Sequence, residues 1–315
     1  MENVNRGIGS SRVAECILTT LGGDGIGASG TYNNTKQVIG LEFDILGETL
    51  NFQIGIGKDR ANLADIVPLA RTVCTGITNV VVKHARSDGA RIPCCEGCSA
   101  CCSRYLVPLS VPEALRFNEE ISAAPAYRRE SIWSSCLLSA RLILSQKPPK
   151  PFMRKADAVS PAGPVDLNLI SNWYMSLKLR CPFLYNHTCS IYDQRPLACR
   201  EHFITGSVRA CRGQRGFAEV VEMPVQMPNV LGQLAGELEG TPAEAVILPL
   251  ALVWGEENLE RAERTWPTVI MVERFAEIVK TMASRSLPPA ASQRTIIGLS
   301  KKRPAANQLC RSSSG

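Results

Sequence analysis

The residues with the clearest chemical potential are five cysteines within the run Cys94–Cys102. Three of them, Cys95, Cys98 and Cys101, have the spacing C-x2-C-x2-C. A C-x2-C step lets two thiolates converge on one soft metal while the backbone N–H groups between them turn inward to the sulfurs. The spacing therefore predicts a thiolate metal site, and it leaves one ligand to come from elsewhere in the chain.

A second group of cysteines, further along the chain, can supply the missing ligand. Cys181 begins the run Cys-Pro-Phe-Leu, and Cys199 lies in Arg-Pro-Leu-Ala-Cys-Arg-Glu. Because Cys-Pro also ends the bacterial ferredoxin pattern, Cys181 is a candidate for that ligand. We call residues 94–102 the first cysteine window and residues 181–211 the second. Their candidate metal ligands are Cys95, Cys98, Cys101, Cys102, Cys181, Cys189, Cys199 and Cys211.

Two kinds of metal centre fit these thiols. An iron–sulfur cluster of the 4Fe-4S type explains the unbroken C-x2-C-x2-C step, which in bacterial ferredoxins holds three irons of a cubane. Structural zinc takes four ligands, usually from two paired steps, so eight cysteines are enough for two zinc sites. Adjacent Cys101 and Cys102 project differently from the backbone, so one of them is expected to serve a second metal or to pack. We expect an iron–sulfur cluster, with zinc as the alternative.

Two arginines beside Cys199, Arg195 and Arg200, are candidate cofactor-binding residues. A cluster held by four thiolates is anionic, so a nearby guanidinium would offset its charge and donate hydrogen bonds to sulfur. The alternative is a surface ion-pair group with Asp193 and Glu201, worth about 0–1 kcal/mol.

The remaining candidates are expected to play structural roles. His187 and His202 are lone loop histidines, each expected to be solvated or hydrogen-bonded instead of bound to metal. Cys136 lies in a predicted helix, and free cysteine is among the most buried residue types, so it is expected to pack in the core. The sequence shows no convincing Ser/His/Asp set and no paired catalytic carboxylates.

Residues 90 to 215 resemble the CxxCxxCC, or YkgJ-like, family of cysteine-cluster proteins, which is described as a zinc- or iron-chelating domain. The motifs CPFL, C-x-IY and RPxxCRE recur in the family's order around the second group of cysteines. The resemblance assigns metal binding to seven of the eight candidate cysteines by motif, and to Cys211 by its spacing. A similar cysteine-rich region occurs in flagellin lysine methylases, which are associated with an iron–sulfur cluster, but no second region of this chain matches them.

The elements that must position the two windows are mainly helical. Apolar residues alternate over 38–46 and 49–56, which predicts a hairpin with one buried face. Ser110-Val111-Pro112-Glu113 has the residues of a capping box and predicts that a helix begins there. Helical spacing is also found at 62–84, 125–145, 165–178, 230–239 and 256–283. The second cysteine window has the Pro, Asn and Asp content of a loop.

These patterns predict an α+β fold that is mainly helical, with a small N-terminal β-hairpin and helices that anchor two metal-binding cysteine loops. Residues 36–283 are expected to form this cysteine-cluster domain. Residues 1–35 are rich in Gly, Ser, Thr and Asn and are expected to be a flexible segment, and residues 284–315 a disordered basic tail.

The net charge of +6 is concentrated in that tail. Six of the 35 basic residues and no acidic residue lie in 284–315, so the rest of the chain carries 29 basic and 29 acidic residues. Nucleic-acid binding, which requires a basic face, is therefore not expected of the folded part. The absence of a signal sequence, the lack of a run of 18 apolar residues and the odd count of 13 cysteines favour a cytoplasmic protein with reduced thiols and no membrane partner.

Two functions are compatible with the sequence. The first is a cytoplasmic metal-binding protein whose cluster is structural, relays electrons or is carried for a protein partner. The second is a cluster-dependent protein-modifying enzyme, similar to a methylase. The absence of a recognisable nucleotide or S-adenosylmethionine loop favours the first, but whether the protein is an enzyme stays open.

Overall fold

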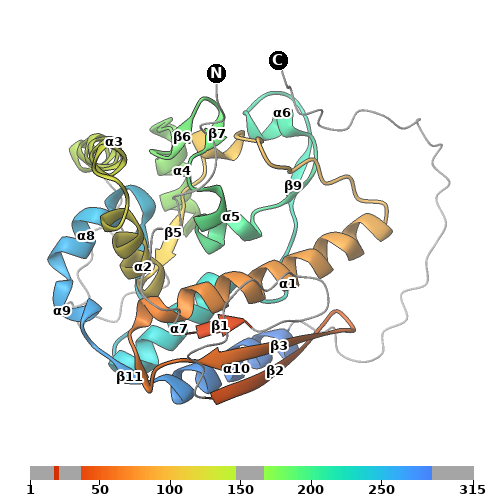
Figure 1. Ribbon diagram of the computed structural model, residues 1–315. Helices are drawn as coiled ribbons and strands as arrows, with labels where there is room; N and C mark the ends of the chain where they lie inside the picture. Colours follow the sequence, from red (N-terminus) through yellow and green to blue (C-terminus); the bar gives the residue numbers. More distant parts are fainter. Residues whose placement is uncertain (1–17, 21–36, 147–166, 286–315) are drawn as a thin grey trace, which may run out of the picture.

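A long central helix divides the molecule into two regions (Figure 1). Helix α1 (Val67–Ser87) has a sheet and two helices on one side, which we call the sheet region. The segments that carry the cysteines, 94–106 and 181–220, lie on the other side, and we call them the cysteine region. The α+β, mainly helical fold class is thus confirmed. The computed structural model describes residues 18–20, 37–146 and 167–285.

The predicted hairpin is present. Strands β2 (Gln37–Ile45) and β3 (Glu48–Ile56) pair antiparallel along their whole length, so that Leu41 faces Phe52. The alternating side chains of β2 are buried from Leu41 onward. A third strand, β1 (Leu18–Thr20), pairs with the other edge of β3. No strand was expected there, because β1 lies within residues 1–35, which were predicted to be a flexible segment. Most of that segment lies outside the described residues.

Helix α1 packs on this sheet through an apolar stripe. A 3-10 turn (Leu63–Ile66) precedes it, and there Asn62 and Asp65 form a reciprocal capping box. Leu63–Ser87 is long and apolar enough to cross a membrane by length and composition, but 61% of that window is buried inside the molecule. This burial is typical of the core helix of a compact domain.

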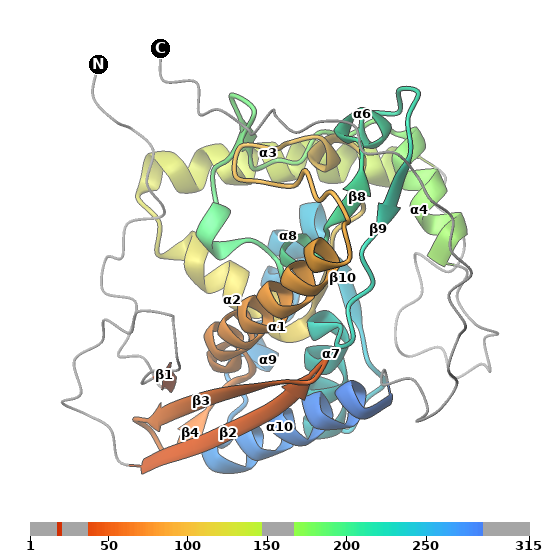
Figure 2. The same ribbon diagram turned by 90° about the vertical axis from the view of Figure 1, so that its right-hand side faces the viewer.

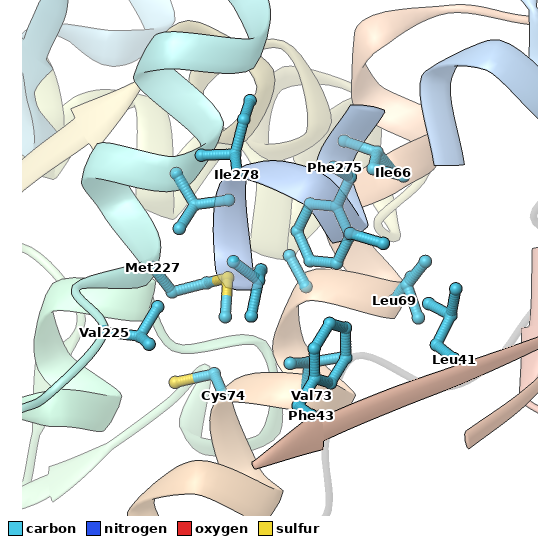
Figure 3. Packing of buried hydrophobic residues seen from close by; sticks show 14 of the residues in the cluster. Leu41, Phe43, Ile66, Leu69, Val73, Cys74, Val225, Met227, Phe275 and Ile278 are labelled. Carbon is cyan, nitrogen blue, oxygen red and sulfur yellow. The ribbon is translucent and has the colours of Figure 1, made fainter. Parts of the chain in front are cut away.

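The sheet region is completed by helices α7 (Met227–Glu239) and α10 (Thr268–Arg285). Figure 3 shows Phe275 of α10 and Met227 of α7 facing α1 and the hairpin. The buried side chains form one continuous cluster that draws on β2, β3, α1, α7 and α10. This large apolar core holds the sheet region together without any metal.

Three further helices were predicted correctly. Helix α2 (Val111–Ser122) begins at the expected capping box, in which Ser110 and Glu113 bond reciprocally. Helices α3 (Ala126–Ser145) and α4 (Leu167–Ser176) match the other two predicted ranges. The short strands β5 (Pro108–Ser110) and β10 (Ala245–Ile247) pair beside α2.

The helical prediction for 256–283 is correct for most of the range, but the structure interrupts the helix at residues 263–267. Helix α8 (Ala251–Glu257), after a 3-10 turn (Leu248–Leu250), and helix α9 (Leu259–Ala262) end before strand β11 (Trp266–Pro267), which pairs with β4 (Arg60–Ala61). Pro267 has no N–H to donate and disfavours helical backbone in the residue before it. The backbone is therefore extended at Trp266, and helix α10 begins at Thr268.

The cysteine region consists of short elements joined by turns. Figure 2 shows the segment after α1 lying beside β8 and α6. The second window was predicted to be a loop, and the structure refines this to several short elements. They are β6 (Leu184–Tyr185), β7 (Thr188–Cys189), a 3-10 turn (Tyr192–Gln194), α5 (Leu197–Glu201), β8 (Ile204–Gly206), α6 (Val208–Cys211) and β9 (Ala218–Val220).

Candidate metal centre

The two cysteine windows lie against each other although they are far apart in the sequence. The backbone N–H of Cys181 donates to the carbonyl oxygen of Cys102 at 2.6 Å. The N–H of Ile204, at the start of β8, donates to the Sγ of Cys94 at 3.4 Å. These contacts bring the cysteines of both windows to the same side of α1.

The first window folds as a series of tight turns. The N–H of Cys98 donates to the carbonyl of Cys95, and that of Cys102 to the carbonyl of Ser99, both at 3.1 Å. Gly97, which lies between Cys95 and Cys98, has φ +84°, a conformation that other residues rarely adopt. A 3-10 turn (Cys101–Ser103) then leads toward β5. The glycine therefore allows the C-x2-C step to turn without strain.

Thiols from both windows line one cavity of about 130 Å³. His202, Arg195 and Tyr192 also line it, together with the apolar side chains Phe203 and Val208. The cysteines around the cavity are Cys94, Cys95, Cys98, Cys101, Cys199 and Cys211. Six soft ligands around one cavity are a donor set suited to zinc or to iron–sulfur chemistry.

Five of the eight predicted ligands therefore share the cavity, and three do not line it. Cys181 and Cys189 pack against the apolar cluster that contains Phe183, as Cys199 does, and do not line the cavity. Cys102 is joined to the second window through its carbonyl instead of lining the cavity. Each of the three still adjoins a cavity cysteine, since Cys102 follows Cys101 and the charges of Cys181 and Cys189 raise the pKa of Cys199.

Cys94 is the ligand candidate that the sequence analysis missed. It lines the cavity next to Cys95 and accepts the hydrogen bond from Ile204. The available signal was its place at the start of the five-cysteine run, outside the regular C-x2-C-x2-C spacing.

The thiols surround the cavity but do not converge on one point. Across residues 37–146 and 167–285, no three Cys, His, Asp or Glu side chains lie close enough together to hold a single metal ion. The eleven cysteines in these ranges are all free thiols. The residues thus fit a thiolate-bound metal by donor chemistry, while a mononuclear site would require several side chains to reorient.

Burial raises the pKa of several cysteines in the two windows, which favours the protonated thiol there. It raises the pKa of Cys181 to about 12 and that of Cys199 well above the usual value for a thiol. A hydrogen bond with Cys102, followed by burial, raises the pKa of Cys101. Because thiolates are the ligands, metal binding at this site must displace protons.

Of the two predicted arginines, only Arg195 faces the cavity. Its guanidinium stacks over the ring of Tyr192, with Cζ 3.7 Å from the ring centroid, and its Nε donates to the carbonyl of Tyr192 at 3.0 Å. Its positive charge lowers the pKa of Cys101, Cys189 and Cys199, in opposition to burial. Arg195 is therefore placed to stabilise thiolates.

Arg200 points away from the cavity. Its Nε donates to the carbonyl of Arg195 at 3.1 Å, its Nη1 contacts the hydroxyl of Thr75 at 3.4 Å, and its Nη2 donates to the carbonyl of Asp193. Arg200 thus braces the backbone of the second window against α1. The alternative, a surface ion-pair group, is not formed among the described residues either, because the carboxylate of Glu201 accepts the N–H of Met227 instead.

The two loop histidines have different surroundings. His202 lines the cavity and stacks on Tyr105, with ring centroids 4.2 Å apart, and burial lowers its pKa. His187 lies at the tip of the β6–β7 hairpin with φ +62°. His202 follows Cys199 by three residues in the sequence, but its place at the cavity depends on the tertiary fold.

Buried polar residues of the scaffold hold the second window in place. The carboxylate of Glu113, in α2, is 3% exposed and accepts the N–H of Leu197 at 2.8 Å, which caps α5. Glu201, at the end of α5, accepts the N–H of Met227 at 2.7 Å, and burial raises its pKa to about 8. Arg71 of α1 donates to the carbonyl of Gln194 at 3.1 Å. Cys199 is thus carried by a helix fixed at both ends.

Two other cysteines are buried outside the cavity. Cys136 is 2% exposed in the apolar cluster beside α3, which confirms its predicted role in packing. Cys74 is 1% exposed in α1, and its Sγ lies 3.8 Å from Oε1 of Glu201. Burial and the adjacent carboxylate raise the pKa of Cys74, so it is not an accessible ligand.

Comparison with protein families agrees with this geometry. Residues 94–215 match the family model CxxCxxCC, whose description is "Putative zinc- or iron-chelating domain". The match begins at Cys94 and ends after Cys211, so it spans all six cavity cysteines. The chain has no significant match among curated proteins or among solved structures. The segment from Cys94 to Arg215 thus matches the CxxCxxCC domain, and the match supports zinc or iron chelation by this segment.

Proposed function

We propose that this protein holds an iron–sulfur cluster, of the 4Fe-4S type, in the cavity between its two cysteine windows. The cluster has a structural role, relays electrons or is carried for a protein partner, in the cytoplasm. Cys95, Cys98 and Cys101 of the first window are the proposed ligands, with Cys199 or Cys211 as the fourth. Cys181 is replaced as the expected fourth ligand because it does not line the cavity.

The observation that carries this proposal is the spread of the thiols. Four sulfurs bound to one zinc at ~2.3 Å lie roughly 3.8 Å from one another, which leaves no room for a water-sized cavity between them. Here six thiols surround a cavity of about 130 Å³, and no three among the described residues converge as a mononuclear site requires. A polynuclear cluster, whose ligands are held apart by its own iron and sulfide, suits this arrangement better.

The surroundings of the cavity also suit a cluster. Arg195 offsets the negative charge of thiolates, and the N–H of Ile204 donates to the sulfur of Cys94. When bound, the cluster supplies one-electron chemistry or structural cross-linking. The protein's own residues bind it, balance its charge and cover it with Tyr192, Phe203 and His202.

The decisive experiment is purification of the full chain without oxygen, followed by assays of iron, zinc and sulfide. We expect brown protein with broad absorption near roughly 400 nm, which arises from sulfur-to-iron charge transfer. Iron and sulfide in equal amounts, with a Mössbauer spectrum of a cubane, are the expected result. Colourless protein with stoichiometric zinc and no sulfide would overturn the proposal in favour of zinc.

A further inference from the structure

The rim of the cavity carries a group of arginines that the metal centre does not use. Arg209, Arg212 and Arg215 follow one another through α6 and the turn after it, and all three are exposed. Exposed Arg91 adjoins them, because its carbonyl accepts the N–H of Gly206 at 3.0 Å. These residues lie beside Cys211 and Val208, which line the cavity.

Arg104, which follows the first window, belongs to the same group. Its guanidinium lies so close to Gly213 that a side chain there would come within 2.6 Å of it. We call Arg91, Arg104, Arg209, Arg212 and Arg215 the arginine rim. Figure 2 shows α6 and β8 beside the segment that holds Arg91 and Arg104.

The arginine rim is not neutralised by its neighbours. Within the part of the chain that the structure describes, none of its five members forms an ion pair. The acidic residues nearest in the chain are Asp88, after α1, Glu96, in the first window, and Glu219, on β9, and all three are exposed. Five positive charges against three negative ones leave a basic surface around the mouth of the cavity.

We infer that the arginine rim is the docking surface for an acidic protein partner that approaches the metal centre. Its composition favours a protein over a nucleic acid, because it contains arginine and no lysine and adjoins two exposed apolar side chains, Phe217 (67% exposed) and Val220 (55% exposed). Arginine and aromatic residues are enriched in protein interfaces, whereas lysine is depleted there. The wider chain outside the tail is also electrically balanced, unlike a nucleic-acid-binding protein.

Because the arginine rim lies beside the cavity, a partner docked there would be close to the metal centre. Opposite charges steer two proteins together and fix their orientation. A partner bound at the rim would stand over the opening beside Cys211, so electrons or a cluster could pass over a short distance. This inference rests on the proposed function for its purpose, but binding itself can be measured without it.

The test uses the full chain, purified without oxygen, and a labelled peptide of alternating glutamate and tyrosine. The variant Arg209→Glu/Arg212→Glu/Arg215→Glu reverses the three exposed charges nearest Cys211. We expect it to weaken peptide binding about tenfold or more, and to remove the salt dependence of that binding. The matched control Lys58→Glu/Lys280→Glu/Arg285→Glu changes the charge equally on exposed residues of the sheet region, and should bind the peptide as the parent protein does.

Two further variants keep the test decisive. If the triple variant folds poorly, Arg212→Glu alone should still weaken binding severalfold. Phe217→Ala should weaken it with no change in salt dependence, because its exposed ring contributes apolar contact. Equal binding by the parent protein and the Arg212→Glu and triple variants would overturn the inference. Tighter, arginine-dependent binding to single-stranded DNA of the same charge would also overturn it, in favour of a nucleic-acid surface.

Metal and sulfide assays on each variant separate this inference from the proposed function. Arginine-dependent peptide binding by a protein without iron and sulfide would sustain the docking surface and refute the cluster. Iron and sulfide in full amounts, without such binding, would refute the docking surface alone.

Discussion

The sheet region and the cysteine region are held together in different ways. In the sheet region, strands of nine residues and long helices bury one continuous apolar cluster that includes Phe43, Ile54 and Phe275. In the cysteine region, strands have two or three residues and helices four or five, and half-buried thiols lie beside an apolar cluster shared with α2, α3 and α8. Two-residue strands are not stable by themselves, so this region depends on its neighbours and on the metal.

The sheet region thus has a large apolar core, whereas the cysteine region is the part whose order we expect a metal to complete. Three groups outside the cysteine region form hydrogen bonds with it: the carboxylate of Glu113, the guanidinium of Arg71 and the N–H of Met227. These contacts fix the second window, and through it Cys199, before any metal binds. The first window is held mainly by its own turns and by contacts with the second.

The largest expected effect is that of metal removal. A chelator, applied without oxygen, should increase hydrogen exchange in residues 94–106 and 181–220, because their order is coupled to metal binding. Exchange in β2, β3 and α1 should change little. Mass spectrometry of peptides from each region measures both. Loss of protection over the whole chain at once would show that the two regions are not independent.

Substitution of a cavity cysteine should have a similar but local effect. Cys98→Ser and Cys199→Ser each remove one thiol from the cavity and should abolish most metal binding, as measured by elemental analysis. Cys136→Ala is the matched control, since this buried cysteine packs against the core away from the cavity. A control variant that loses metal as fully as the cavity variants would contradict the assignment of the site.

A second kind of variant destabilises the sheet region and leaves all the cysteines in place. Phe275→Ala removes a fully buried ring from the core of the sheet region and should lower the free energy of unfolding by about 3–5 kcal/mol. Urea denaturation measures this change. The protein that remains folded should bind as much metal as the parent chain, so reduced metal content per folded molecule would argue against the division into two regions.

A smaller effect is expected where the scaffold meets the cysteine region. Glu113→Gln replaces one acceptor oxygen with an amide that cannot accept from Leu197 and Ser110 together, and should cost about 1–3 kcal/mol. It should also speed metal loss to a chelator, because α5 carries Cys199. Glu119→Gln, on the same helix but partly exposed, is the control. Unchanged kinetics of metal loss would show that Glu113 stabilises the fold without positioning the ligand.

The smallest effect concerns charge at the cavity. Arg195→Met removes the guanidinium that lowers the pKa of three nearby thiols, so the reduced, more negative state of a cluster should become less favourable. The reduction potential, measured by protein film voltammetry, should therefore fall. Arg180→Met, which removes an exposed arginine beside Cys181, should leave it unchanged. A potential that does not respond to Arg195 would indicate a structural role in stacking on Tyr192.

The sequence by itself determined the features that depend on neighbouring residues. Alternating side chains predicted β2 and β3, and the sequence from Ser110 to Glu113 predicted the start of α2, because a strand face and a helix cap involve residues only a few positions apart. The C-x2-C-x2-C spacing indicated the thiolate site for the same reason. The match to the CxxCxxCC family model confirmed the kind of domain.

Only the tertiary structure decided which residues share the cavity. Cys94 and His202 line it, Cys181 does not, and Arg200 turns toward α1, although spacing alone made the opposite assignments reasonable. The pairing of Trp266 and Pro267 with a strand about two hundred residues earlier likewise depends on the tertiary structure. The physical reason is that a cavity is formed by packing between segments distant in the chain, so its lining depends on where helices such as α1 and α5 come to rest and not on the order of residues within either window.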